Sequence, residues 1–294
     1  MPRLFITGIC GFIGRHIATE AMRQGFEVSG CDRRPIKIDG ASIHKADVRD
    51  KKAMLKLTKK ADSIIHLAAV TSNLEFEKKM PYCYEVNVNG TNNIFEAAFE
   101  NGCEKLLYAS SSAVYADKFS EDAAIDIGGM KNHYAKTKLM NEAVGKSYRS
   151  QGLLDAVGMR FFNVYGAWEN DKGNYASIVS LFMKQKKAGM ISIYGDGKQA
   201  RDLIHADDVA KIALLLLRKG RKEVYNVGTG KATSYNEIAD LVGGNRTYVK
   251  NPLSTYQLLT KADTKRLLDD IGNFTFVDVK EGIARLASGN RMLQ

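Results

Sequence analysis

The stretch Thr7-Gly8-Ile9-Cys10-Gly11-Phe12-Ile13-Gly14 decides the fold. It follows the apolar run Leu4-Phe5-Ile6, which is typical of a buried strand, and it opens a segment of helical periodicity from Phe12 to Gln24. Glycines at a strand-to-helix turn let the backbone approach a ligand closely, and the helix N-terminus offers N–H groups without helical partners. A turn that binds nothing can use the same glycines, but the position at the first such junction favours a dinucleotide pyrophosphate. We therefore predict cofactor contacts at Gly8, Gly11, Phe12, Ile13 and Gly14.

The alternation of strand and helix continues outward from this loop. Short apolar runs predict buried strands over residues 27–31, 63–69, 105–110 and 155–161, with helices over 51–60, 84–101 and 134–150. Such alternation is typical of a doubly wound parallel sheet, so we predict a Rossmann-type α/β fold with a smaller C-terminal α/β substrate-binding domain. The chain has only four prolines and no visible linker, so the second domain must be interleaved with the first or follow it directly. The expected dinucleotide domain comprises residues 1–162 and about 202–226, and the substrate domain about 163–201 and 227–294.

The composition argues against several classes of protein. Hydrophobic residues make up 45% and charged residues 26% of the 294 residues, as in ordinary globular proteins. No apolar run reaches the roughly 20 residues that span a bilayer, and a strand pattern begins within residues 1–8, so we expect no membrane contact and a cytoplasmic location. The four cysteines form no C-x-x-C pair, so neither a disulfide framework nor a metal site is expected. The formal charge of +10 is spread over several helical segments, which favours a solvated basic surface over a nucleic-acid site.

An acidic residue beyond the glycine loop bears on the choice of dinucleotide. Asp32 falls at the end of the second strand, where a carboxylate can accept both adenosine ribose hydroxyls and repel a 2′-phosphate. NAD is therefore expected, although Arg33 and Arg34 could neutralise that phosphate, which keeps NADP open. Asp47 and Val48 could hold the adenine edge, or they could form a capped turn before the next helix.

A tyrosine and a lysine four residues apart lie in a segment predicted as helix. Tyr134 and Lys138 therefore share one helical face, where the ammonium group can favour the phenolate and so form an acid–base device. Such pairs also occur by chance on many helices. The case is strengthened by the run Ser110-Ser111-Ser112, which follows a strand at the edge where ligands bind to such sheets.

In their joint order these segments resemble the extended short-chain dehydrogenase/reductases, and specifically the NAD-dependent nucleotide-sugar epimerase/dehydratase family. The resemblance covers nearly the whole chain. It rests on the glycine loop, His66-Leu67-Ala68-Ala69, Asn87-Val88-Asn89-Gly90-Thr91, Ala109-Ser110-Ser111-Ser112-Ala113-Val114-Tyr115, Tyr134 with Lys138, Arg160-Phe161-Phe162-Asn163-Val164-Tyr165-Gly166, Tyr194-Gly195-Asp196-Gly197, Arg201-Asp202 and Tyr225-Asn226-Val227-Gly228. One departure is Ala116, where the family usually has glycine.

The resemblance implies a role for each of these residues. Tyr134 would remove a proton from a sugar hydroxyl, Lys138 would orient the cofactor ribose, and Ser111 would hydrogen-bond the reacting oxygen, with Ser110 and Ser112 as alternatives. Further NAD contacts are implied for Leu67, Ala68, Ala69 and Asn87, and nucleotide-sugar contacts for Ser111, Ser112, Asn163, Lys172 and Arg201. Without the resemblance, His66 would be a packed strand residue, Asn87 a polar residue bonded to backbone, and Arg201 the partner of Asp202 in a surface ion pair.

The family includes more than one reaction. Its dehydratases carry an acidic pair directly after the catalytic hydroxyl, and its decarboxylases also use an acid in this loop, where this chain has Ser112 and Ala113. That leaves epimerases, and the stretches 88–91 and 112–115 look most like UDP-sugar 4-epimerases. The stretch 170–177 instead resembles the ADP-heptose 6-epimerases, in which Lys172 would be a second acid–base group.

Three further expectations complete the sequence analysis. A dinucleotide-sensing regulator is the alternative from a different class, and the intact tyrosine–lysine pair argues against it. The resemblance implies a homodimer formed through residues 84–101 and 134–150. Asp207 and Asp208 are expected to cap the helix over 209–217 rather than to bind a metal.

Overall fold

A computed structural model describes residues 1–115, 119–169, 176–251 and 257–289. Its centre is a parallel sheet with the strand order β10-β6-β5-β4-β1-β2-β3. The crossovers on either side of β1 make it doubly wound, as the sequence predicts. The strands are β1 (Arg3–Thr7), β2 (Glu27–Asp32), β3 (Ser42–Lys45), β4 (Ser63–His66), β5 (Lys105–Ser111), β6 (Asp155–Phe161) and β10 (Val224–Val227).

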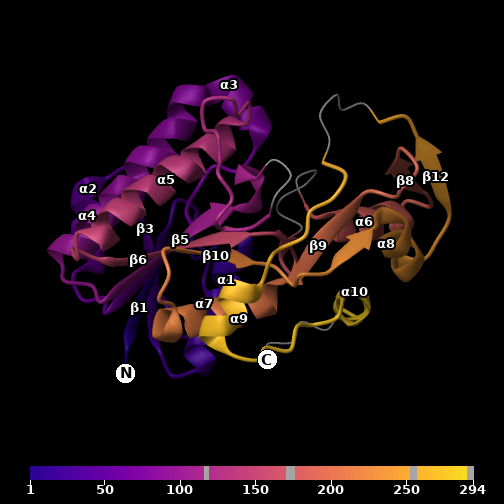
Figure 1. The fold of residues 1–294 in the computed structure, drawn as a ribbon. Helices are drawn as coiled ribbons and strands as arrows, with labels where there is room; N and C mark the ends of the chain where they lie inside the picture. Colours follow the sequence, from indigo (N-terminus) through magenta and orange to yellow (C-terminus); the bar gives the residue numbers. More distant parts are fainter. Residues whose placement is uncertain (116–118, 170–175, 252–256, 290–294) are drawn as a thin grey trace.

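Helices cover both faces of this sheet (Figure 1). Both faces of β1 are therefore buried, with Leu4 and Ile6 in one apolar core and Phe5 in the other. One face carries α1 (Phe12–Arg23), α7 (Ala206–Lys219) and α9 (Lys265–Ile271), and the other carries α2 (Lys51–Thr58), α4 (Gly90–Glu100) and α5 (His133–Ser150).

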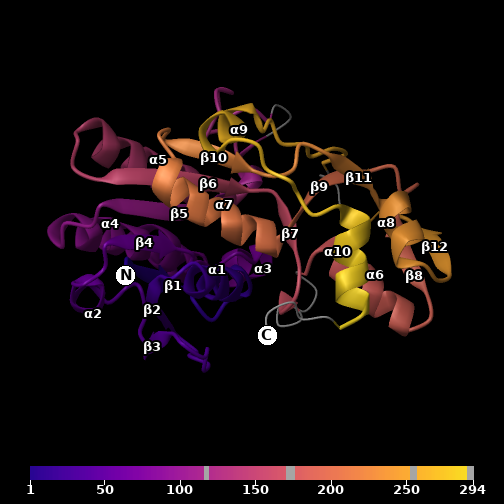
Figure 2. The ribbon, with the colours of Figure 1, turned by 90° about the horizontal axis from the view of Figure 1, so that it is seen from below.

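The remaining strands form a second group beside the large sheet (Figure 2). A three-stranded sheet has the order β11-β9-β7, and β8 pairs in parallel with β12. These elements are β7 (Asn163–Tyr165), β8 (Ile191–Tyr194), β9 (Ala200–His205), β11 (Ala232–Ser234), β12 (Arg246–Val249), α6 (Ile178–Lys187), α8 (Tyr235–Val242) and α10 (Val279–Ala287). The chain passes from the large sheet into this group after β6, returns through α7 and β10, leaves again through β11, α8 and β12, and returns once more as α9 before α10. The domain boundaries stated above remain a prediction.

Two helical expectations need correction. The predicted single helix over 84–101 is split, because the π-helical turn η1 (Glu85–Asn89) separates α3 (Asn73–Tyr84) from α4. Helix α7 begins at Ala206, and its N-cap is His205, whose Nδ1 accepts a hydrogen bond from the Asp207 backbone N–H at 3.3 Å. Asp207 and Asp208 therefore lie in the first turn and do not cap the helix.

Among the described residues, no helix combines the length and apolar character needed to cross a membrane. The same residues contain no group of three or more side chains arranged to hold a metal ion.

Candidate active site

The glycine loop joins β1 to α1 and leaves no room for side chains. Gly8 has a positive φ of +70°, and a Cβ atom there would lie 2.9 Å from the backbone N of Ala68. A Cβ atom on Gly14 would lie 2.3 Å from the Gly8 carbonyl oxygen. The loop therefore presents bare backbone beside the start of α1, which is the arrangement that a pyrophosphate requires. These residues fit the dinucleotide that the sequence predicts.

A cavity of about 840 Å³ extends from this loop to α5. It lies at the carboxyl ends of β1, β4, β5 and β6, where ligands bind to doubly wound sheets. Many of the predicted residues line it: Gly8, Gly11, Phe12, Ile13, Gly14, Leu67, Ala69, Ser111, Tyr134 and Lys138. Ala68 contributes through its backbone contact with Gly8.

Tyr134, Lys138 and Ser111 come together at the wall of the cavity. The ammonium nitrogen of Lys138 lies 5.5 Å from the centre of the Tyr134 ring and donates a hydrogen bond to the Ala109 carbonyl at 2.9 Å. Ser111 lies close enough to Tyr134 for its hydroxyl to lower the pKa of the phenol. The helical spacing of α5 and the carboxyl end of β5 thus converge on one point.

Burial perturbs both titratable groups in this cluster. Desolvation raises the pKa of Tyr134 to about 12, although the Ser111 hydroxyl lowers it in part. Desolvation also lowers the pKa of Lys138 to about 8, because only 3% of its surface is exposed. A tyrosine that is to serve as a base here needs a cation close by to stabilise the phenolate, and Lys138 can provide it.

The three serines of the run have different environments. Ser110 is buried, and its hydroxyl donates to a carboxylate oxygen of Glu142 at 2.5 Å. Ser111 caps the short 3₁₀ turn η2 (Ser112–Val114) by accepting from the Ala113 N–H at 3.1 Å. Of the three, Ser111 is the hydroxyl that meets Tyr134, which favours the choice made from the sequence.

The residues predicted near the adenosine lie at the carboxyl end of β2 and beyond β3. Asp32 accepts a hydrogen bond from the Arg34 backbone N–H at 2.9 Å. Asp47 forms an ion pair with Arg49 at 2.8 Å, and this hydrogen-bonded partner lowers the pKa of Asp47. Neither aspartate lines the cavity, and Val48 is buried against Gly90, so their contact with adenosine stays a prediction.

Two residues on which the family resemblance rests, His66 and Asn87, form hydrogen bonds in the protein interior. The Asn87 amide donates to the Val70 carbonyl at 2.8 Å and accepts from the Val70 N–H at 2.7 Å, which fixes the chain after β4. His66 bonds to Thr7 at 2.6 Å and to Thr91 at 2.9 Å, and burial lowers its pKa to about 3. His66 is thus a packed strand residue and Asn87 is bonded to backbone, the roles given above as the alternatives to those that the resemblance implies.

Three of the predicted substrate contacts, Asn163, Arg201 and Ser112, do not line the cavity that Ser111 and Tyr134 line. The Asn163 amide donates to the Asp202 carbonyl at 3.2 Å and to the Thr260 hydroxyl at 3.0 Å. Arg201 donates from Nη1 to the Ala200 carbonyl at 2.9 Å, and its guanidinium lies 5.5 Å from the centre of the Tyr235 ring. Lys172 lies outside the described residues.

Several cavity residues were missed by the sequence analysis. Helix α3 contributes Leu74, Glu75 and Lys78 opposite the glycine loop. The pattern Ser72-x-x-Glu75 could have revealed this helix, since the Ser72 hydroxyl accepts from the Glu75 N–H at 3.2 Å as a helix cap does. Trp168 closes another part of the wall, with a positive φ of 64° and a ring 4.6 Å from that of His16.

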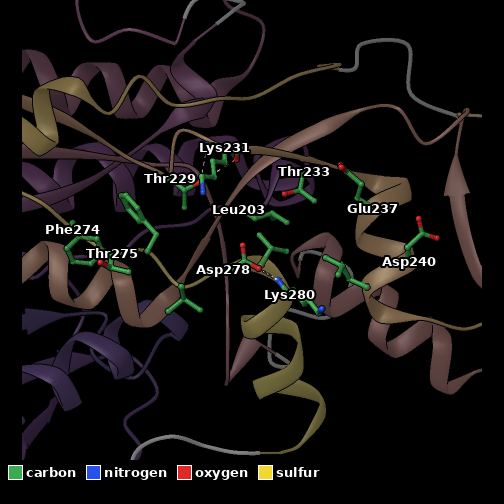
Figure 3. A pocket seen from close by; sticks show the side chains of 14 residues that line it. Leu203, Thr229, Lys231, Thr233, Glu237, Asp240, Phe274, Thr275, Asp278 and Lys280 are labelled. Carbon is green, nitrogen blue, oxygen red and sulfur yellow. Dashed lines mark hydrogen bonds between the residues drawn. The ribbon is translucent and has the colours of Figure 1, made fainter.

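A second cavity of about 670 Å³ lies in the other group of elements. Figure 3 shows Phe274 and Thr275 on one side of it, Glu237 and Asp240 on the other, and Leu203 between them. It shares no lining residue with the first cavity and includes none of the predicted site residues. The glycine loop and the tyrosine–lysine pair therefore direct the chemistry to the first cavity.

The fold and the first cavity, with its glycine loop and tyrosine–lysine pair, define a dinucleotide enzyme of the short-chain dehydrogenase/reductase class. The chain belongs to the NAD dependent epimerase/dehydratase family, whose model matches residues 4–228. Its cofactor is NAD. A dinucleotide-sensing regulator is therefore set aside in favour of an enzyme.

Individual relatives are similar over nearly their full length. A putative UDP-glucose 4-epimerase of Methanocaldococcus jannaschii is 31% identical and is matched over 97% of each chain. An ADP-L-glycero-D-manno-heptose-6-epimerase of Cupriavidus pinatubonensis is 27% identical over 96% of each chain. The solved UDP-glucose 4-epimerase of Thermus thermophilus in complex with NAD is 27% identical, covers 96% of each chain and has a TM-score of 0.81.

Proposed function

We propose that this enzyme inverts carbon 4 of a UDP-linked sugar, of the UDP-glucose/UDP-galactose type, by oxidising it to a keto-sugar and reducing it again. The observation that carries the proposal is the cluster of Ser111, Tyr134 and Lys138 on the cavity that begins at the glycine loop. The similarity to a putative 4-epimerase over 97% of the chain supports the choice of reaction.

Each residue of the cluster has a defined task in this proposal. The glycine loop and Lys138 would hold NAD, which would supply a hydride acceptor and donor for the sugar carbon. Tyr134 takes the proton of the sugar hydroxyl and gives it back, while Ser111 hydrogen-bonds the reacting oxygen. The ammonium group of Lys138 stabilises the phenolate and orients the cofactor ribose. Inversion follows when the keto-sugar turns over before the hydride returns to its other face.

The loop after β5 argues against elimination and decarboxylation. Water elimination needs an acid that protonates the leaving hydroxyl, and the positions directly after Ser111 are Ser112 and Ala113. Tyr134 alone is sufficient for a 4-epimerase, because the same phenol can serve both faces of a sugar that rotates.

The direct test is to incubate the NAD-loaded protein with a panel of UDP-, ADP-, GDP- and dTDP-sugars and to follow the sugar signals by NMR. We expect interconversion of UDP-glucose and UDP-galactose, or of another UDP-sugar pair that differs at carbon 4. The Tyr134→Phe protein is the matched control and should give no epimer. Turnover of ADP-heptose without turnover of any UDP-sugar would contradict the proposal.

The second candidate is a 6-epimerase of an ADP-heptose. It is favoured by the resemblance of residues 170–177 to those enzymes and by the relative of that name. The variant Lys172→Met separates the two candidates. In a 4-epimerase Lys172 is at most a substrate contact, so KM should rise while kcat is spared. A fall in kcat as large as that in Tyr134→Phe would make Lys172 a chemical group and favour the 6-epimerase.

A further inference from the structure

A buried ion pair between Glu142 and Arg160 lies next to the tyrosine–lysine cluster. Glu142 follows Lys138 by one turn of α5, so the two side chains lie on the same helical face. Its carboxylate accepts hydrogen bonds from Nε of Arg160 at 2.9 Å and from Nη2 at 2.6 Å. The side chain of Glu142 is only 12% exposed and that of Arg160 only 5%. This paired geometry is the strong form of a carboxylate–guanidinium contact.

The pair is connected to the residues around the reacting groups. The same carboxylate accepts from the Ser110 hydroxyl at 2.5 Å, and Ser110 lies between Ala109, which holds Lys138, and Ser111, which meets Tyr134. On the other side, Nη1 of Arg160 donates to the Tyr115 hydroxyl at 2.6 Å, which in turn donates to Asn226 at 2.7 Å. The network thus joins α5 to the carboxyl ends of β5, β6 and β10.

We propose that Glu142, held in place by Arg160, is a positioning residue for proton transfer: it fixes the carboxyl end of β5 against α5 and keeps the ammonium group of Lys138 charged. The proposal rests on the tasks given above to Tyr134 and Lys138, but it does not depend on which sugar is the substrate.

The electrostatic part of the proposal follows from the groups that face Lys138. Desolvation lowers the pKa of Lys138 to about 8, and the charge of Glu142 is what raises it against this effect. Loss of that charge would leave a cationic guanidinium without its partner in the same region, and a like charge disfavours an ammonium ion. The titratable and charged groups around Lys138 and its ion-pair neighbours are Tyr134 and Glu142 on α5, His66 on β4, Arg160 on β6, and Tyr115 after η2.

The test measures the ionisation of Lys138 directly, without a sugar and without NAD. Protein labelled with ¹³Cε-lysine is titrated by NMR, and Lys138→Met assigns the signal. In Glu142→Gln we expect the midpoint to fall by about one pH unit or more, which is the scale of one lost charge contact. Glu142→Asp, which retains the charge, should restore at least part of the shift. An unchanged midpoint in Glu142→Gln would overturn the proposal.

A second variant separates positioning from simple loss of stability. Glu142→Gln leaves a buried guanidinium without its carboxylate, which destabilises the fold. The double variant Glu142→Gln with Arg160→Gln removes both charges and should fold better, yet its Lys138 should still titrate below the parental midpoint. If the double variant instead recovers the parental midpoint, the pair serves only the fold and the proposal is wrong.

Enzyme kinetics supply the third measurement. For Glu142→Gln we expect kcat to fall about tenfold or more at pH 8.5, with a smaller loss at pH 6.5, because the ammonium form survives at the lower pH. The matched control is Asp155→Asn, which breaks the ion pairs of Asp155 with Lys105 and with Arg149 at the opposite end of β6 and should leave the pH profile unchanged. An equal loss of kcat at both pH values would contradict the proposed role. If no nucleotide sugar is turned over, the proposed function is wrong. The proposed role of Glu142 is then still tested by the NMR titration, which needs no substrate.

Discussion

Asp208 offers a quantitative test of the energetics of this fold. It lies in the first turn of α7 with 0% of its surface exposed. One carboxylate oxygen accepts from the Val277 N–H at 2.7 Å, and the other has no hydrogen-bond partner among the described residues. Desolvation raises the pKa of Asp208 from 3.8 to about 6. The folded protein therefore prefers the protonated acid.

The magnitude follows from linkage between protonation and folding. A raised pKa contributes stability that is fully present below the unfolded value of 3.8 and is lost as the pH rises through about 6. The difference is roughly two pKa units, and at about 1.4 kcal/mol per unit it corresponds to about 3 kcal/mol. Asp208→Asn, which cannot ionise, should therefore gain most of this difference, about 2.5 kcal/mol, relative to the parent between pH 4 and pH 7.5.

The assay is urea unfolding of both proteins across this pH range. The quantity to compare is how the difference in unfolding free energy between Asp208→Asn and the parent changes with pH. A constant difference is not informative, because the new amide can itself cost stability at every pH. Asp207→Asn is the neighbouring control: desolvation raises the pKa of Asp207, but the hydrogen bond with His16 and the charges of His205, His16 and Lys211 together outweigh it and lower the pKa. Its loss relative to the parent should grow as the pH rises. Parallel curves for Asp208→Asn and the parent would refute this reasoning.

Three further predictions concern the cofactor, the chemistry and the assembly. Tyr134→Phe should lower kcat by about 10²-fold or more, the scale of general acid–base catalysis, and should change the NAD dissociation constant little; turnover within a few-fold of the parent would rule out Tyr134 as the base. Asp32→Ala should reduce the preference for NAD over NADP, because the carboxylate that repels a 2′-phosphate is lost while Arg33 and Arg34 remain; dissociation constants measured by calorimetry check this, and an unchanged ratio would contradict it. We also propose a homodimer formed through residues 84–101 and 134–150, so light scattering at micromolar concentration should give about twice the chain mass of 32.5 kDa, and a monomeric mass would exclude it.

The parts of the fold that were predicted correctly are those where local pattern and burial agree. The runs over 4–6 and 155–161 are largely apolar, so each predicts its strand in the large sheet. Helix α3 was missed because it contains Pro81 and a non-helical residue at Lys79, and its apolar residues give no clear helical period. The π-helical turn between α3 and α4 has no signature in a helical pattern.

The site shows a similar limit. The spacing of Tyr134 and Lys138 requires only one helix, so the sequence places both on one face without knowledge of the rest of the fold. Glu142 belongs to the same helical row, yet its importance depends on Arg160 and Ser110, which are brought to it by β6 and β5. The hydrogen bonds between Asn87 and Val70 also depend on tertiary structure, so the sequence spacing could not predict them.

Trp168 is the sole tryptophan of the chain, and it stands in the wall of the cofactor cavity. All indole fluorescence of this protein therefore comes from one place, 6.0 Å from the guanidinium carbon of Arg15 and in contact with the ring of His16. A ligand that enters the cavity changes the polarity and the quenching groups around that single emitter. Occupancy can thus be titrated optically with unlabelled wild-type protein, one nucleotide or sugar at a time.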